Sequence, residues 1–254
     1  MIKIQQLAVL NDNYIYLIHD TESGDTAVVD PALAEPVLSA LKNNHWQLKY
    51  ILNTHHHNDH VGGNIALKSA THCKIAGSAA DHVRIPAIDL KLQQNDTLNL
   101  GNYSIKIIEC SGHTLGHIAF YIPEAHALFC GDTLFSMGCG RLFEGSAEQM
   151  WQSLKKFMQL PLDTQIYCAH EYSLANAQFA LSVEPNNQDL IKTNQQITQL
   201  RADNLPTVPA SLETELATNP FLRPDSTDIR STLNMNNASN LEVFTELRKR
   251  KDTF

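Results

Sequence analysis

The chain has 254 residues, of which 43% are hydrophobic, and its formal net charge at pH 7 is −8. This composition is typical of a folded protein with one large domain, or with a larger domain and a smaller one attached. The acidic balance argues against nucleic acid as the main partner, because phosphate backbones are bound by basic surfaces. No apolar run reaches the length of a membrane span, so we expect no membrane partner.

Strand patterns dominate the first two thirds of the chain. Short apolar runs bounded by turn residues predict a series of strands. These strands cover residues 2–10, 13–20, 26–30, 50–53, 97–100, 103–109, 126–130 and 165–168. Apolar residues at helical spacing predict helices over 35–44 and 146–158, and the second of these begins with a capping box formed by Ser146 and Gln149.

The pattern changes after about residue 171, where strand-like runs give way to helical spacing. We predict helices within 187–204, 211–221 and 239–250. The composition shift predicts an α/β domain at residues 1–172 and a smaller helical domain at residues 173–254.

The first residues and the cysteines favour a cytoplasmic protein. The opening MIKIQQLAVLNDNYIYLI matches neither a secretory signal nor an Arg-rich transit peptide. The five cysteines form no C-x-x-C pair, which is typical of a reduced compartment. Those beside candidate site residues (Cys110, Cys130 and Cys168) lie in apolar runs, so we expect buried packing and no thiolate catalysis.

The segment THHHNDH at residues 54–60 follows directly after a predicted strand. Alternate side chains of an extended chain point the same way, which predicts a shared face for its histidines and Asp59. Further His and Asp residues come just beyond other strands, and ligands collect at the carboxyl ends of strands in open α/β sheets. The candidate ligands with this placement are His55, His57, Asp59, His60, His113, Asp132 and His170.

This set of nitrogen and oxygen donors is too large for one tetrahedral ion, but two divalent ions can share it if one carboxylate bridges them. Asp132, an isolated carboxylate that follows a glycine, is the natural bridge. Two such ions generate hydroxide near neutral pH and stabilise an oxyanion, which predicts a hydrolase. The donor types suit zinc, iron and manganese alike.

The other histidines have ordinary explanations. We expect His56 to point away from the ligands and pack, and His117 either to orient a ligand or to serve a structural role. The histidines expected at surface or helix-capping positions are His19, His45, His72, His82 and His126.

The run from His55 to His60, with the ligands that follow it, resembles the metallo-β-lactamase superfamily. The segments THHHNDHVGGN, HTLGH, GDTLFSMGCGRLFEG and CAHEY are more specifically similar to glyoxalase II, the hydroxyacylglutathione hydrolase family. NPFLR and the ending RKRKDTF extend the likeness over the whole chain. The resemblance implies an αββα sandwich followed by a smaller helical domain that binds substrate.

The resemblance also implies an activity, namely hydrolysis of the thioester S-D-lactoylglutathione to glutathione and D-lactate in methylglyoxal detoxification. It places one metal, zinc in the first instance, on His55, His57 and His113. The second metal is held by Asp59, His60 and His170. Asp132 and a hydroxide bridge the two metals, and Asp59 and Asp132 count as catalytic. We expect a monomer that binds a small glutathione thioester.

The residues implied to hold glutathione are Arg141, Phe143, Tyr172, Arg248 and Lys251. Two of them depart from the family pattern, because Arg141 stands where lysine is usual and Phe143 where tyrosine is common. The first change keeps the charge and alters its geometry, and the second removes a hydroxyl contact. We hypothesise that Arg248 and Lys251 clamp the glycine carboxylate of glutathione.

Other interpretations of the histidine run remain open. It could be a solvated polar loop, or a structural or storage metal site in a binding protein. Structural zinc sites are closed and rich in thiolates, unlike this set. Three other members of the same superfamily are further alternatives. The absence of a signal-peptide pattern argues against a secreted β-lactamase, and the negative charge argues against an RNA-processing nuclease. The extended helical region argues against a persulfide dioxygenase, which would use one iron.

Overall fold

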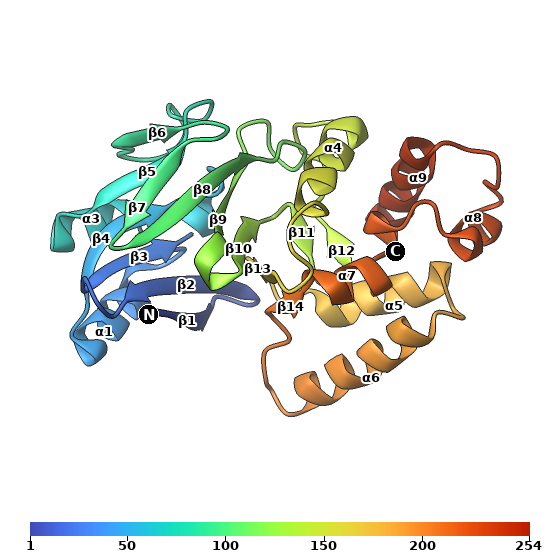
Figure 1. Cartoon of the computed structure of the whole chain (residues 1–254), viewed down its shortest axis with the longest axis horizontal. Coiled ribbons are helices and arrows are strands. Elements are labelled where there is room, and N and C mark those ends of the chain that lie inside the picture. The colour runs from blue at the N-terminus through green and yellow to red at the C-terminus, as the bar shows by residue number, and fades with distance from the viewer. The chain divides into compact units, whose positions relative to one another are not determined.

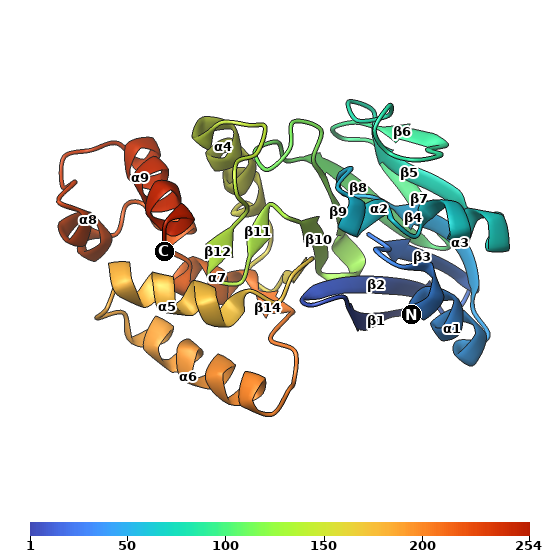
Figure 2. The ribbon, with the colours of Figure 1, turned by 180° about the vertical axis from the view of Figure 1, so that it is seen from behind.

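A computed structural model describes residues 1–254, and contacts within the chain group them into two units (Figures 1 and 2). The first unit comprises Met1–Glu109 and Leu115–Gly131, and the second comprises Cys110–Thr114 and Asp132–Phe254. The short piece at 110–114 therefore belongs with the C-terminal half, although it interrupts the first unit in sequence. No helix combines the length and the apolar character that crossing a membrane requires.

The first unit contains a six-stranded sheet in the order β1-β2-β3-β4-β5-β6. Strands β1 to β3 pair antiparallel, and β3 to β6 pair in parallel. The strands are β1 (Ile2–Val9), β2 (Asn13–Asp20), β3 (Asp25–Val29), β4 (Gln47–Leu52), β5 (Lys74–Ser78) and β6 (Leu90–Leu92). Parallel pairing brings the carboxyl ends of β3 and β4 to one edge, where Asp30 and the histidine-rich loop begin.

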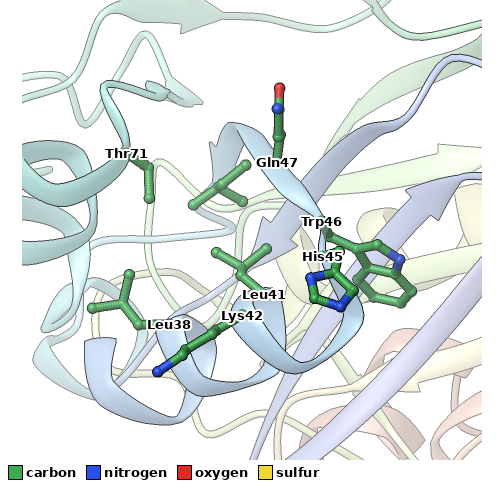
Figure 3. Close-up of a pocket in the computed structure, with 8 residues that line it drawn as sticks. Leu38, Leu41, Lys42, His45, Trp46, Gln47 and Thr71 are labelled. Carbon is green, nitrogen blue, oxygen red and sulfur yellow. The ribbon is translucent and has the colours of Figure 1, made fainter.

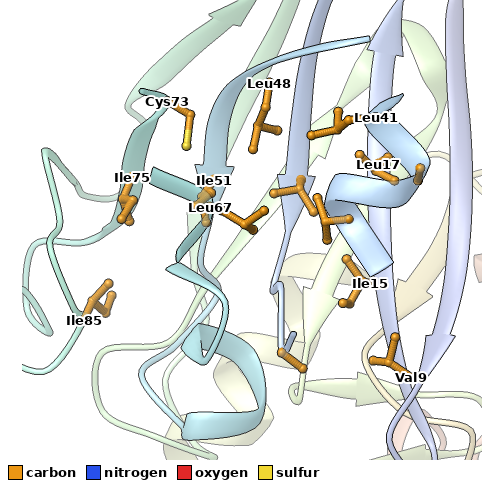
Figure 4. Close-up of a cluster of buried hydrophobic side chains, with 14 residues drawn as sticks. Val9, Ile15, Leu17, Leu41, Leu48, Ile51, Leu67, Cys73, Ile75 and Ile85 are labelled. Carbon is orange, nitrogen blue, oxygen red and sulfur yellow. The ribbon is translucent and has the colours of Figure 1, made fainter. Parts of the chain in front are cut away.

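Helices α1 (Ala34–Asn44) and α3 (Asn64–Thr71) lie on one side of this sheet (Figures 1 and 2). In α1 the buried residues Val37, Ala40 and Leu41 recur at helical spacing, so a single stripe faces the strands. The core shown in Figure 4 joins side chains of both helices to side chains of the strands: Ile15, Leu17, Val28, Leu41, Leu48, Ile51, Leu67 and Ile75.

Four antiparallel strands of the first unit form a second sheet in the order β10-β9-β8-β7. They are β7 (Thr97–Leu100), β8 (Tyr103–Glu109), β9 (Ile118–Ile122) and β10 (Ala127–Gly131), with the short 3-10 helix η1 (Pro123–Ala125) between the last two. Every residue of β9 is buried. The ring centroids of Tyr16 in β2 and Phe129 in β10 lie 5.5 Å apart, so the two sheets pack against each other.

The second unit is mainly helical. Its helices are α4 (Ala147–Phe157), α5 (Ser173–Val183), α6 (Gln188–Ala202), α7 (Leu212–Thr218), η2 (Pro220–Leu222), α8 (Thr227–Leu233) and α9 (Asn240–Asp252). Its strands are β11 (Leu134–Phe135), β12 (Gly138–Cys139), β13 (Gln165–Cys168) and β14 (Ala210–Ser211). Helices α5 and α6 run side by side (Figures 1 and 2), and Ala177, Ala180, Leu190 and Ile197 form their shared core with Met137.

The strands predicted from the sequence are present, and so is the helix over 146–158. Its capping box is confirmed, since Ser146 Oγ accepts from the Gln149 amide and the Gln149 side chain accepts from the Ser146 amide. The helix predicted within 211–221 is present as α7, and it ends at Thr218, just before Pro220 starts a separate 3-10 turn. Helix α5 and strands β5 and β9 were not predicted.

Candidate metal centre and substrate pocket

The histidine-rich loop begins where β4 ends, and the end of β3 holds it in place. The amide of Thr54 donates to Asp30 Oδ1 at 2.8 Å, and its hydroxyl donates to Oδ2 at 2.6 Å. Asn53 reaches across the loop and donates from Nδ2 to the His60 carbonyl at 3.1 Å. These bonds fold the chain back into the single turn α2 (Asn58–Val61), so that both ends of the loop lie together.

Within this loop the candidate ligands converge. His55 Nε2 lies 3.0 Å from His57 Nδ1, and the ring centroids of His55 and His60 are 4.0 Å apart. Asp59 Oδ2 lies 3.4 Å from His60 Nε2. These imidazoles and the Asp59 carboxylate supply, within one short loop, the nitrogen and oxygen donors that divalent metals accept.

Asp30 is a site residue that the sequence analysis missed. Its Oδ2 lies 3.0 Å from His60 Nδ1, and its carboxylate is buried. The potential ligand atoms of Asp30, His55 and His60 all lie within 4.8 Å of one another. A carboxylate on Nδ1 fixes the tautomer that presents Nε2 to a metal. The signal was in the sequence, because Asp30 is the last residue of a predicted strand, close to the position that Asp132 has after its own strand.

Two further polar contacts hold the loop and were also missed. Asn13, at the start of β2, donates from Nδ2 to Asp59 Oδ2 at 3.1 Å and to the Asp59 carbonyl at 3.3 Å. His56 belongs to no ligand group and instead places Nδ1 3.0 Å from Oδ2 of the buried Asp81. Nothing local in the sequence marks either partner.

The remaining histidines divide as expected, with one exception. His117 stacks on His55 with centroids 4.7 Å apart, which supports that ligand ring from behind. Three of the histidines expected at surface or capping positions end a helix in the left-handed conformation: His45, His72 and His126. The prediction was wrong for His19, which is buried, stacks on Trp46 at 4.3 Å and has its pKa lowered by burial.

The second unit brings the other three candidate ligands together. Asp132 lies between two histidines, with Oδ2 3.4 Å from His113 Nε2 and Oδ1 3.3 Å from His170 Nε2. The Arg141 carbonyl lies 2.9 Å from His113 Nδ1, which fixes that ring as Asp30 fixes His60. A carboxylate whose two oxygens face different histidines has the geometry expected of a bridging ligand.

A cavity of about 510 Å³ in the second unit opens beside these ligands. Its lining includes His113 and Asp132, and it also includes all five predicted substrate residues: Arg141, Phe143, Tyr172, Arg248 and Lys251. Phe143 is 64% exposed, and its ring lies 5.2 Å from that of His113. The cavity therefore combines candidate metal ligands, aromatic faces and cations.

The cations of this cavity differ in their exposure and in the hydrogen bonds that hold them. Arg248 is buried and donates from Nη1 to the Cys139 carbonyl at 2.7 Å and from Nη2 to Asp252 at 2.9 Å. Lys251 donates to the Ala175 carbonyl at 3.1 Å, and burial, followed by the positive charges of Arg248 and Arg141, lowers its pKa. Arg141 is largely exposed.

Cys139 alone among the cysteines lines this cavity, and the other large cavity is lined by different residues. All five cysteines are free and buried, and burial raises the pKa of Cys139 to about 11 and that of Cys168 to about 12. They are therefore poor nucleophiles. A second cavity, of about 540 Å³, lies in the first unit at the end of α1 (Figure 3) and contains none of the predicted site residues.

Family models match the chain along almost its whole length. Residues 10–170 match the metallo-beta-lactamase superfamily, and residues 171–254 match the hydroxyacylglutathione hydrolase C-terminus. The hydroxyacylglutathione hydrolase of Methylococcus capsulatus is 53% identical over 100% of this chain and 99% of its own length. That of Rhodospirillum rubrum is 51% identical over 99% of this chain and 98% of its own length.

Solved structures show the same fold at lower identity. ETHE1 from Myxococcus xanthus superposes with a TM-score of 0.70 at 22% identity, covering 97% of this chain and 90% of its own. The B3 metallo-beta-lactamase BLEG-1 gives a TM-score of 0.67 at 20% identity, covering 88% of this chain and 100% of its own. The fold is thus the metallo-β-lactamase α/β sandwich followed by a C-terminal helical domain. With about half of its residues identical to full-length relatives of that name, the chain belongs to the hydroxyacylglutathione hydrolase family of metallo-β-lactamase-fold hydrolases.

Proposed function

We propose that this protein hydrolyses S-D-lactoylglutathione to glutathione and D-lactate, the second step of methylglyoxal detoxification. The observation that carries the proposal is full-length identity to relatives named hydroxyacylglutathione hydrolase. The combination of metal-type ligands with a cationic, aromatic cavity supports it, because a thioester of a charged peptide needs both. The catalytic domain is proposed to span residues 1–172 and the substrate-binding domain residues 173–254, in a monomeric, cytoplasmic enzyme.

We infer that two divalent ions, zinc in the first instance with iron or manganese as alternatives, are held by the candidate ligands. One ion is assigned to His55, His57 and His113. The other is assigned to Asp59, His60 and His170, with Asp132 bridging. The donors fit, because they are imidazoles and carboxylates, and Asp30 and the Arg141 carbonyl hold Nδ1 of two of the imidazoles.

When bound, such a pair of cations supplies hydroxide near neutral pH and neutralises the oxyanion that forms on attack. Of the chain's own carboxylates, Asp132 would bridge the two ions, and Asp59 would orient the attacking water and accept its proton. Asn13 holds the Asp59 side chain for this role. The glutathione thiolate is a good leaving group, so the cavity needs no dedicated acid to protonate it.

Substrate binding is assigned to the cations and rings of the cavity. Lys251 and Arg248 are proposed to hold the glycine carboxylate, and Arg248 Nε, which is buried without a hydrogen-bond partner, is the donor that remains for it. Arg141, being exposed, is suited to the second carboxylate of glutathione. Phe143 and Tyr172 provide apolar faces for the peptide between them.

The proposal is tested by measuring hydrolysis of S-D-lactoylglutathione and metal content on the same purified sample. We expect rapid turnover with about two metals per chain, and loss of turnover on chelation that added zinc restores. A protein that holds two metals and does not cleave this thioester would retain the metal assignment and overturn the substrate. A protein that cleaves it without bound metal would overturn the mechanism.

A further inference from the structure

A short hairpin separates the candidate bridging ligand from the substrate cation. Strands β11 and β12 pair Leu134 with Cys139 and Phe135 with Gly138, and the turn between them contains Met137 at a φ of 52°. Asp132 lies two residues before the hairpin and Arg141 two residues after it. The position of both therefore depends on the path of this hairpin.

The backbone of the hairpin is hydrogen-bonded by side chains of the helical segments. Asn219 donates from Nδ2 to the Phe135 carbonyl at 3.2 Å and to the Gly138 carbonyl at 3.0 Å. The Met137 amide donates to Glu215 Oε2 at 2.8 Å. Two more helices supply donors, because Asn176 in α5 bonds the Ser136 carbonyl at 3.1 Å and Arg248 in α9 bonds the Cys139 carbonyl at 2.7 Å.

Glu215 and Asn219 form the centre of this arrangement. Both are fully buried, and Asn219 Nδ2 donates to Glu215 Oε2 at 2.9 Å, so each orients the other. They lie one helical turn apart at the end of α7, which presents both side chains to the same face. Buried backbone groups without hydrogen-bond partners destabilise a fold. A different path of the hairpin that broke these bonds would therefore be less stable.

The base of the hairpin connects this arrangement to the ligands. The Gly140 amide donates to the Thr133 carbonyl at 3.2 Å, and a Cβ at Gly140 would come within 1.9 Å of the Asp132 carbonyl oxygen. The next carbonyl, that of Arg141, accepts from His113 Nδ1 at 2.9 Å. A shift of the hairpin thus displaces Asp132, releases His113 and moves Arg141 together.

We propose that Glu215 and Asn219 are positioning residues, which hold the hairpin and thereby set both the metal ligands Asp132 and His113 and the substrate cation Arg141. The inference rests on the proposed function for the roles of those three residues. The helical domain then acts on metal binding as well as on substrate binding. Neither residue touches the metal ligands or the cavity directly.

The test compares Asn219→Ala with Asn187→Ala. Asn187 is a matched control in the same unit, since its side chain donates to Ala217 and Glu184 and caps α6, and none of these bonds reaches the hairpin. Three quantities are measured: hydrogen exchange of the peptide covering 133–141, zinc affinity by competition with a chelator, and kcat and KM. For Asn219→Ala we expect hydrogen exchange of the hairpin to become faster by about ten-fold or more and zinc affinity to fall by about ten-fold or more. We also expect KM to rise.

For Asn187→Ala, all three quantities should stay within about two-fold of wild type. The inference is overturned if Asn219→Ala matches this control in exchange and zinc affinity.

A second pair of variants, Glu215→Ala and Glu215→Gln, decides if Asn219→Ala does not fold. Glu215→Ala should loosen the hairpin and lower zinc affinity. Glu215→Gln keeps an acceptor for the Met137 amide and should do neither. Equal behaviour of these two also overturns it. Hydrogen exchange and zinc affinity are measured without substrate. They can therefore be interpreted even if the wild-type protein does not cleave the thioester.

Discussion

The buried carboxyl of Glu215 leads to a prediction of how the free energy of unfolding depends on pH. Burial raises the pKa of its carboxyl from 4.5 to about 7, against the lowering effect of its bonds from Asn219 and Met137. The folded protein therefore binds this proton more tightly than the unfolded chain does. The contribution of this carboxyl to the free energy of unfolding is complete below pH 4.5 and decreases as the pH rises to about 7. Above that pH the contribution no longer changes. A shift of this size corresponds to about 3 kcal/mol.

Glu215→Gln removes the titration and keeps an oxygen for the bonds from Asn219 and the Met137 amide. The difference in unfolding free energy between variant and wild type should therefore move by about 3 kcal/mol in favour of the variant between pH 4.5 and pH 8. The assay is urea unfolding across that range on samples with equal metal content, so that histidine titration cancels in the difference. Parallel curves for the two proteins would refute the assignment of a raised pKa to Glu215.

Three other changes have defined outcomes. Asp30→Ala removes the acceptor on His60 Nδ1 and should lower zinc affinity by about ten-fold to a hundred-fold, measured by chelator competition, while an unchanged affinity would contradict the role of Asp30. Lys251→Ala should raise KM for the glutathione thioester by about ten-fold or more with little change in kcat, whereas the exposed Lys249→Ala should leave KM unaltered. Ser146→Ala breaks the capping box of α4 and should cost about 1 kcal/mol in denaturant unfolding, and a cost near zero would show that the cap is replaced by water.

The candidate ligands could be predicted because each leaves a local mark in the sequence. Asp132 and His170 follow short apolar strands, and the run at residues 55–60 is dense in imidazoles. Asp30 shares this mark, but the other residues that hold the histidine-rich loop do not. Asp81 lies 25 positions from its partner His56, and Asn13 lies 46 positions from Asp59, so only the folded chain brings them together.

The missed elements have a related explanation. Strand β9 is buried on both faces, so it lacks the alternation of apolar and polar residues that reveals a half-exposed strand. Helix α5 also carries apolar residues outside its buried face, among them Leu174, Ala175 and Leu181, and so its sequence shows no single apolar stripe. The stripes of α1 and α4, by contrast, predicted both helices well.

The five-residue excursion at 110–114 has a consequence for how the protein is made. The chain leaves the first unit after Glu109, contributes His113 to the second unit, and returns at Leu115 to complete the first unit with β9 and β10. On the ribosome the first unit cannot close its second sheet until Gly131 has emerged, and His113 then awaits Asp132 and the Arg141 carbonyl, its partners in the second unit. A nascent or prematurely ended chain thus carries the THHHNDH candidate ligands without His170, and under the metal assignment proposed above the complete ligand set exists only late in synthesis.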